Sequence, residues 1–237
     1  MKISFNELID KNLQSMEFVD AIFDEFLSIG GAQKTSDLLI YSSILREIGP
    51  DNVLEFSTAE GLTTSVLIKT MNVYRKNTKL LAFDYDDYHV NKSQNVVSKY
   101  DLSNTKIIKH SYFEPLDFKD TFDMVFIDGF HAQKDGEAIV KMIQPLLSGD
   151  FVLFIHDIGW DSSSTNDFGI ISPYDEWTVW SHLAKQNKLN VFLTAQLMRN
   201  SKYANNQWRS SRALLDSPAG QYSGHSMIIS NFLEVVE

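Results

Sequence analysis

The chain has 237 residues, 43% hydrophobic and 22% charged, a composition typical of a folded globular protein. It contains no cysteine, which excludes disulfides, zinc–cysteine sites and thiol nucleophiles and is consistent with a cytoplasmic protein. The net charge of −10 argues against a nucleic-acid partner, and we expect no signal peptide and no apolar segment of the ~20 residues that span a bilayer. These features predict a soluble, cytoplasmic protein that acts on a small molecule.

The N-terminal part of the chain is predicted to be helical. Residues 5–28 place apolar side chains at helical spacing, and Gly30 and Gly31 interrupt this pattern. Residues 36–48 form a second amphipathic segment, which Gly49 and Pro50 end. We expect these helices, within residues 1–48, either to cover a sheet or to form the face of a homodimer.

From residue 52 onward, short apolar strands alternate with helices. The predicted strands are residues 52–56, 79–84, 105–109, 122–127, 151–155, 189–193 and 225–230. The predicted helices are residues 63–71, 90–100, 136–147 and 175–186. This order indicates βαβ units, and continuous apolar strands indicate a sheet covered on both faces. The sequence therefore predicts an α/β fold: one doubly wound domain over residues 1–237 with a mostly parallel, seven-stranded sheet and a substrate-side loop and helix at about 158–188.

Chemically useful side chains follow five of the predicted strands. They are residues 55–61, Asp84, Ser111 with Tyr112, residues 128–131, and His156 with Asp157. Because ligands of doubly wound sheets bind beyond the carboxyl ends of the strands, we expect these groups to share one rim.

The turn after the first of these strands suits a ligand-binding role. Gly61 would let the backbone approach a ligand, and the N-terminus of the next helix offers free N–H groups. The turn is neither a GxxxxGK[ST] phosphate loop nor a GxGxxG dinucleotide loop. Asp84 is suited to accept hydrogen bonds from two ribose hydroxyls, although a solvated strand-end acid is the alternative.

Two stretches carry a resemblance to a known family. Residues 54–64 read LEFSTAEGLTT and residues 122–158 read FDMVFIDGFHAQKDGEAIVKMIQPLLSGDFVLFIHDI. Over about residues 33–157 the chain resembles the class I S-adenosylmethionine-dependent methyltransferases, and most of all the caffeoyl-CoA and catechol O-methyltransferase group with its bacterial small-molecule and sugar relatives. Glu55 and Gly61 match the family pattern LEIGTxxGxST, whereas Ser57 stands where the family has glycine. Asp150 replaces the second glycine of a later Gly-Gly pair.

The resemblance implies a Rossmann-like methyltransferase fold and S-adenosylmethionine as the cofactor. It implies that Asp84 binds the ribose and that Ser111 and Tyr112 contact the adenine. The full set of expected cofactor-binding residues is Glu55, Ser57, Gly61, Asp84, Ser111, Tyr112 and Asp128. The implied activity is O-methylation of a hydroxyl on a small molecule, either a sugar or a phenolic metabolite.

Two arrangements of the catalytic groups remain open. His131 is the candidate general base, because imidazole titrates near neutral pH; the alternative is a histidine that caps the strand-to-helix turn. Asp128 and Asp157 could bind a divalent cation such as Mg²⁺. His156 stands where metal-dependent relatives offer an oxygen ligand, so a metal-free site in which His131 and His156 share proton transfer is the alternative.

Two other functions are compatible with parts of this pattern. A non-catalytic S-adenosylmethionine-binding module would account for Ser57 and for the incomplete metal pair. A nicotinamide-dependent oxidoreductase would share the fold class but lacks the GxGxxG turn. The aromatic residues Trp160, Tyr174, Trp177 and Trp180 are expected either to line an acceptor pocket or to pack in the core.

Overall fold

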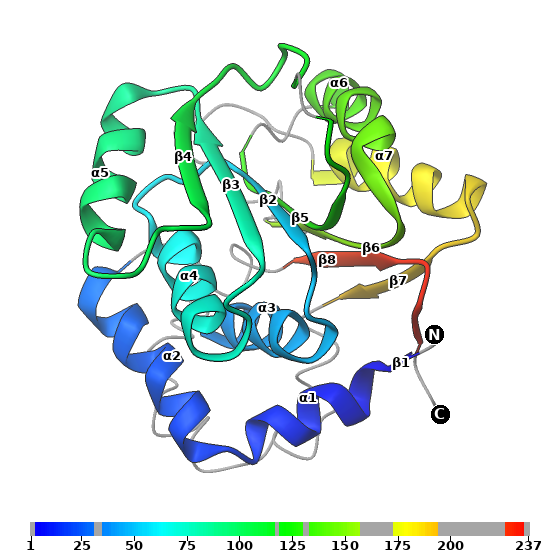
Figure 1. The fold of residues 1–237 in the computed structure, drawn as a ribbon. Coiled ribbons are helices and arrows are strands. Elements are labelled where there is room, and N and C mark those ends of the chain that lie inside the picture. Colours follow the sequence, from blue (N-terminus) through cyan, green and yellow to red (C-terminus); the bar gives the residue numbers. More distant parts are fainter. Residues whose placement is uncertain are drawn as a thin grey trace.

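The computed structural model describes residues 3–30, 35–116, 119–129, 133–156, 173–193 and 226–234. Its centre is a seven-stranded sheet in the order β4-β3-β2-β5-β6-β8-β7 (Figure 1). These strands are β2 (Asn52–Phe56), β3 (Lys79–Asp84), β4 (Thr105–Lys109), β5 (Phe122–Ile127), β6 (Leu147–Ile155), β7 (Asn190–Leu193) and β8 (Met227–Ser230). The strands β2 to β6 are parallel to one another, and only the β6–β8 and β8–β7 pairs are antiparallel. The predicted mostly parallel α/β sheet is confirmed.

Helices cover both faces of this sheet. They are α1 (Phe5–Leu13), α2 (Met16–Ile29), α3 (Thr35–Ile48), α4 (Leu62–Tyr74), α5 (Asp87–Val97), α6 (Gln133–Ile143), the 3₁₀ turn η1 (Gln144–Leu146) and α7 (Pro173–Gln186). A separate parallel pair joins β1 (Ile3–Ser4) to β9 (Leu233–Glu234), near both ends of the chain (Figure 1).

The strands divide their apolar side chains between two cores. Val53 of β2 belongs to the core under α1 to α5, whereas its neighbour Leu54 belongs to the core under α6 and α7. Successive strand residues point to opposite faces, so strands covered on both faces are apolar at every position. Trp180 of α7 is fully buried in the second core, which makes it a packing residue.

Several element boundaries differ from the sequence-based expectation. The helical pattern over residues 5–28 is two helices, because Ser15 ends the first and caps the second by accepting a hydrogen bond from the Phe18 N–H (3.4 Å). α5 begins at Asp87, three residues earlier than expected, since Asp86 caps it through the Tyr88 N–H (2.9 Å). The helix expected to reach Leu147 ends at Ile143, and β6 starts at Leu147.

The parallel register brings the strand ends together. Phe56 of β2 pairs with Phe83 of β3 and with Ile127 of β5, and Ile127 pairs with Ile155 of β6. The residues that follow these four positions therefore lie along one edge of the sheet. Of the expected substrate-side region, residues 158–172 lie outside the described residues, and α7 accounts for most of the rest.

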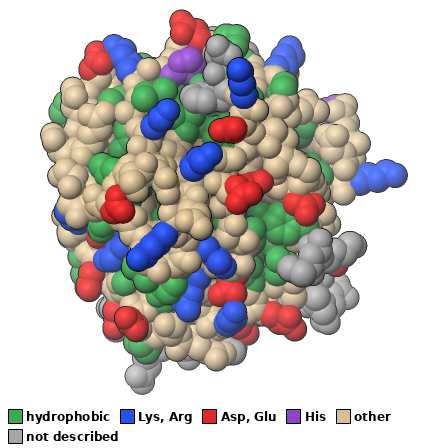
Figure 2. All heavy atoms as spheres, viewed as in Figure 1, with side chains coloured by type: hydrophobic (Ala, Val, Ile, Leu, Met, Phe, Trp, Pro, Cys, Tyr) green, Lys and Arg blue, Asp and Glu red, His purple; other side chains and the backbone are tan. Residues whose placement is uncertain are grey.

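No helix among the described residues has the length and apolarity needed to cross a membrane. On the face shown in Figure 2, acidic and basic side chains are interspersed rather than gathered by sign.

Candidate active site at the strand ends

Glu55 of β2 is a buried carboxylate at the rim. Glu55 is 1% exposed, and neither oxygen of its carboxylate makes a hydrogen bond of standard geometry within the described part of the chain. Burial raises the pKa of Glu55 to about 8, against the lowering effect of Thr64, and the negative charges of Asp128 and Asp84 raise it further. Three carboxylates thus lie close enough to interact, and Glu55 has no cation beside it in the described residues.

The turn after β2 holds an unusual backbone. Ser57 has φ +70°, Ala59 has φ +42° and Gly61 has φ +82°, so three of five consecutive residues occupy the left-handed region. That conformation costs a non-glycine residue about 1–2 kcal/mol, so glycine would be the less strained residue at the positions of Ser57 and Ala59. A Cβ on Gly61 would lie 3.0 Å from the Ser93 Cα, so only glycine fits there.

Ser57 connects the turn to its neighbours. Its N–H donates to the Phe83 carbonyl at 2.9 Å, and its side chain lies 3.5 Å from where a Cβ on Gly129 would stand. Gly129 has φ +125°, so it follows Asp128 in a conformation that suits glycine. The Ser57 side chain also lies beside the Tyr112 hydroxyl and partly offsets the rise in the pKa of Tyr112 that burial causes.

Asp84 at the end of β3 is fully buried and holds the same turn in place. One carboxylate oxygen accepts from the Ala59 N–H (3.1 Å) and the other from the Asp86 N–H (3.1 Å), while His89 Nδ1 lies 3.6 Å away. Asp84 is therefore not a solvated strand-end acid. Each carboxylate oxygen can accept more than one hydrogen bond, so these contacts leave capacity for a ligand hydroxyl.

The residues expected at the adenine follow β4. Ser111 opens a turn in which its hydroxyl accepts from the Phe113 N–H at 3.3 Å. Tyr112 is 3% exposed and packs against Phe83 and Tyr85, with ring centroids at 5.8 and 5.4 Å. This aromatic cluster brings Tyr112 to the end of β3, since Tyr85 directly follows the strand-end acid Asp84.

Asp128 and His156 form a pair between the ends of β5 and β6. The Asp128 N–H donates to the Phe56 carbonyl (3.2 Å) and the His156 N–H to the Ile127 carbonyl (2.9 Å), which extends the sheet to both residues. His156 Nδ1 lies 3.3 Å from Asp128 Oδ1, and His156 is 3% exposed. His156 was weighed from the sequence as a proton-transfer partner, and here it contacts a carboxylate.

The remaining catalytic candidates are not placed. His131 and Asp157 lie outside the described residues, as does Trp160. In the part of the chain that the structure describes, no three acidic or histidine side chains gather in a group that could hold a metal ion.

A narrow cavity of about 10 Å³ connects these residues. It is bordered by Glu55, Ser57, Asp128 and His156 and also by Thr63 and Tyr41. Thr63 and Tyr41 were not predicted as site residues from the sequence. Thr63 follows the Gly61 turn at the start of α4, and a hydroxyl at that place was an available signal. Tyr41 lies on α3, and its apolar neighbours in sequence gave no sign of a site.

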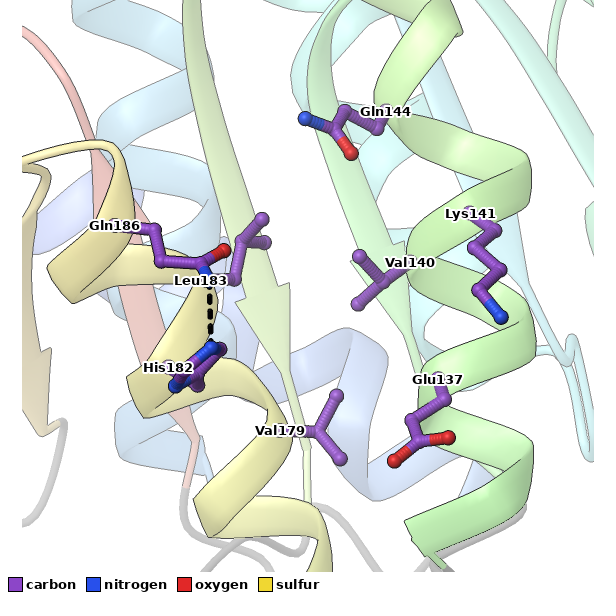
Figure 3. Close-up of a pocket in the computed structure, with 8 residues that line it drawn as sticks. All are labelled: Glu137, Val140, Lys141, Gln144, Val179, His182, Leu183 and Gln186. Carbon is purple, nitrogen blue, oxygen red and sulfur yellow. Dashed lines mark hydrogen bonds between the residues drawn. The ribbon is translucent and has the colours of Figure 1, made fainter.

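A second, larger cavity of about 410 Å³ lies between α6 and α7 (Figure 3). Val140, Val179 and Leu183 point between the two helices, and Gln186 bonds His182 along α7 at 2.6 Å (Figure 3). Because none of its lining residues follows a strand end, this cavity is separate from the rim and is not part of the candidate site.

Comparison with known proteins agrees with this geometry. Residues 54–158 match the family model of a methyltransferase domain, a stretch that contains Glu55, Gly61, Asp84 and Asp128. A search of curated proteins gave no match.

Solved structures with the same fold are methyltransferases. A Klebsiella pneumoniae protein assigned as an O-methyltransferase has a TM-score of 0.61 at 12% identity, over 95% of this chain and 94% of that one. The O-methyltransferase of Bacillus cereus, crystallised with S-adenosylhomocysteine, has a TM-score of 0.57 at 11% identity, over 95% and 91% of the two chains. TomG of Streptomyces achromogenes, an O-methyltransferase of tomaymycin synthesis crystallised with S-adenosylmethionine, has a TM-score of 0.57 at 10% identity, over 90% and 88%. At such identities the likeness establishes the fold, and the match over residues 54–158 identifies that stretch as a methyltransferase domain.

Proposed function

We propose that this chain, as one domain over residues 1–237, transfers the methyl group of S-adenosylmethionine to a hydroxyl oxygen of a small molecule. The observation that carries the proposal is Glu55: a carboxylate 1% exposed, at the rim of a methyltransferase fold, with no cation beside it in the described residues. An uncompensated buried carboxylate is costly, and a ligand ammonium group would remove that cost.

The rim residues fit the parts of the cofactor. Glu55 suits the ammonium of the methionine moiety, and Asp84 retains acceptor capacity for the ribose hydroxyls. Ser111 and Tyr112 follow the neighbouring strand β4, and this position beside Asp84 supports a contact with the adenine. Gly61 and Gly129 keep the backbone free of side chains next to the cavity. When bound, the cofactor supplies a methyl group activated by its sulfonium.

The protein residues must position the acceptor and remove its proton. We assign His131 as the general base, because it lies three residues beyond the Asp128 strand end and a sugar or phenolic hydroxyl must lose its proton during transfer. Asp128 and Asp157 are the candidate ligands should the reaction use a divalent cation. Sugars are the first acceptor class to test and phenolic metabolites the second.

The activity test is transfer of radiolabelled methyl from S-adenosylmethionine to a panel of sugars and catechols, with Mg²⁺ and with a chelator. Methylated product supports the proposal, and loss of turnover with the chelator assigns Asp128 and Asp157 to a metal. Cofactor binding without transfer across the panel would favour the non-catalytic binding module instead.

The substitution His131→Ala tests whether His131 acts as the general base without contributing to cofactor binding. We expect turnover to fall by roughly 10²- to 10⁴-fold with nearly unchanged cofactor affinity. Unchanged turnover, or a large loss of cofactor binding, would contradict the assignment.

A further inference from the structure

A chain of buried hydrogen bonds ends at the cofactor cavity and involves residues far apart in sequence. The Tyr41 hydroxyl of α3 bonds the Ser226 hydroxyl, which precedes β8, and Ser226 Oγ donates to Asp37 Oδ2 at 2.9 Å. Tyr41 is 1% exposed, and Ser226 and Asp37 are fully buried. Burying a polar network in an apolar core costs free energy unless every polar group has a hydrogen-bond partner. The position of this network beside the cavity therefore suggests a role in that site.

The direction of these hydrogen bonds follows from the number of protons. Ser226 has a single hydroxyl proton and donates it to the Asp37 carboxylate. The Tyr41 hydroxyl must then be the donor in its bond with Ser226. Its only proton is used in that bond, so towards anything else the Tyr41 oxygen acts as an acceptor.

The network lies at the rim rather than in the middle of the sheet. Ile155 of β6 pairs with Met227 of β8 in an antiparallel ladder, so Ser226 stands level with His156. The Tyr41 hydroxyl reaches this level because it bonds Ser226. The ring itself packs edge-on against Phe126 and Phe154, with centroids at 5.0 and 4.9 Å, which fixes its orientation.

Tyr41 borders the same cavity as Glu55 and Asp128. Beside the acidic side chains of Glu55 and Asp128, the phenolic oxygen supplies a further acceptor, and none of the lining residues in the described part of the chain is lysine or arginine. Its volume of about 10 Å³ is close to that of a single water, and an ammonium group has a similar size.

We propose that Tyr41 is a further cofactor-contacting residue, which accepts a hydrogen bond from the ammonium group of the methionine moiety, and that Ser226 and Asp37 are the positioning residues that set its hydroxyl. This inference rests on the proposed function, since it takes S-adenosylmethionine as the ligand.

The experiment compares three ligands on the full chain by titration calorimetry: S-adenosylmethionine, S-adenosylhomocysteine and 5′-methylthioadenosine, which lacks the amino-acid end. The variant is Tyr41→Phe, which keeps the ring and removes the hydroxyl. Tyr74→Phe is the matched control, because Tyr74 is an aromatic of α4 that packs against Phe18 and Arg46 away from the rim.

We expect Tyr41→Phe to bind both amino-acid-containing ligands on the order of tenfold more weakly and 5′-methylthioadenosine with unchanged affinity. Ser226→Ala should give a smaller loss with the same ligand pattern, and it serves as the test if Tyr41→Phe does not fold. Tyr74→Phe should match the wild type for all three ligands.

Two results would overturn the inference: unchanged S-adenosylmethionine affinity in Tyr41→Phe, or an equal loss for 5′-methylthioadenosine, which would indicate general distortion of the site. A wild-type chain that binds 5′-methylthioadenosine but neither of the other ligands would also overturn it. A wild-type chain that binds none of the three ligands would instead refute the proposed function, and the inference with it.

Discussion

Two buried glutamates of this protein have opposite environments. Glu25 on α2 is 3% exposed and is surrounded by partners: Ser65, Tyr100 and Lys99 bond its carboxylate, with Lys99 Nζ at 2.9 Å, and Lys69 Nζ lies 3.4 Å away. Burial raises its pKa, but these hydrogen bonds outweigh burial, and the pKa falls below the ordinary value of 4.5. Glu55 is equally buried, has two carboxylates as neighbours, and its pKa rises to about 8.

The comparison shows that burial alone does not identify a functional carboxylate. Glu25 joins α2 to α4 and to the segment that follows α5, and the chain itself supplies its hydrogen-bond partners, so its role is structural. Glu55 is a destabilising feature of the free protein, and a cationic ligand is the simplest source of compensation. The site is therefore identified by a buried carboxylate that has no cation beside it in the described residues, and not by burial of an acidic residue alone.

The largest effect that we expect from this comparison is on ligand binding. Glu55→Gln should weaken S-adenosylmethionine binding by about 10- to 100-fold, because a charge-assisted hydrogen bond contributes about 1.5–3 kcal/mol. The free energy of unfolding should not decrease, since burial already holds Glu55 in its neutral form and the amide is neutral at every pH. Equilibrium binding and urea unfolding measure the two quantities, and a stability loss with unchanged affinity would reverse the roles of the two glutamates.

Glu25→Gln should do the opposite. We expect the free energy of unfolding to fall by about 1–2 kcal/mol, because the charge-assisted bonds are lost while the partly exposed lysines can be solvated by water. Cofactor affinity should match the wild type. Urea unfolding tests the first statement and calorimetry the second; weakened cofactor binding would show that the α2 cluster is coupled to the rim.

The pH dependence of stability should have opposite signs at the two sites. The folded-state pKa of Glu55 is about 8, above its ordinary value of 4.5, so its contribution is fully present below pH 4.5 and is lost as the pH rises through about 8. The lowered pKa of Glu25 gives a contribution that is present above pH 4.5 and is lost as the pH falls through the folded-state value. Unfolding of the wild type and of each Gln variant across this range gives both differences.

The same pKa shift makes cofactor binding release a proton. If the ammonium group binds the Glu55 carboxylate, affinity should rise with pH up to about 8, and near pH 7 close to one proton should leave the protein. Calorimetry in two buffers with different ionisation enthalpies measures this proton. Binding without proton release would show that Glu55 is already ionised in the free protein.

The smallest effect concerns backbone strain in the first turn. Ser57→Gly should raise the free energy of unfolding by up to about 1 kcal/mol, because glycine adopts φ +70° without cost while the unfolded chain gains some entropy. Lys188→Gly, at φ +53° beyond α7, is the control for the same substitution outside the site. A loss of stability in Ser57→Gly alone would mean that the contact with Tyr112 outweighs the strain.

The fold was accessible from the sequence because its signals are local. The apolar run of residues 79–84 marks a strand that is buried on both faces, and residues 105–109 mark a partly exposed edge strand. The limits of both strands were predicted correctly. The break between α1 and α2 was missed because apolar spacing continues across Gln14 and Ser15, and only the cap at Ser15 shows that the helix ends there.

The candidate site was accessible only in part. Asp84 ends β3, Asp128 follows β5 and Glu55 is the next-to-last residue of β2, so chain order alone predicts that they share a rim. The bonds from Ala59 and Asp86 to Asp84 depend on backbone placement and have no sequence signal. Tyr41 and Ser226 are 185 residues apart, and only the packing of α3 against the sheet brings them together.

The central claim is that the rim around Glu55 binds S-adenosylmethionine, and titration calorimetry of the wild-type chain with this ligand tests it most directly. The account predicts saturable binding in the micromolar range, tighter at pH 8 than at pH 6. The absence of binding heat at both pH values, with and without Mg²⁺, would contradict it and would leave Glu55 as a buried charge without a ligand.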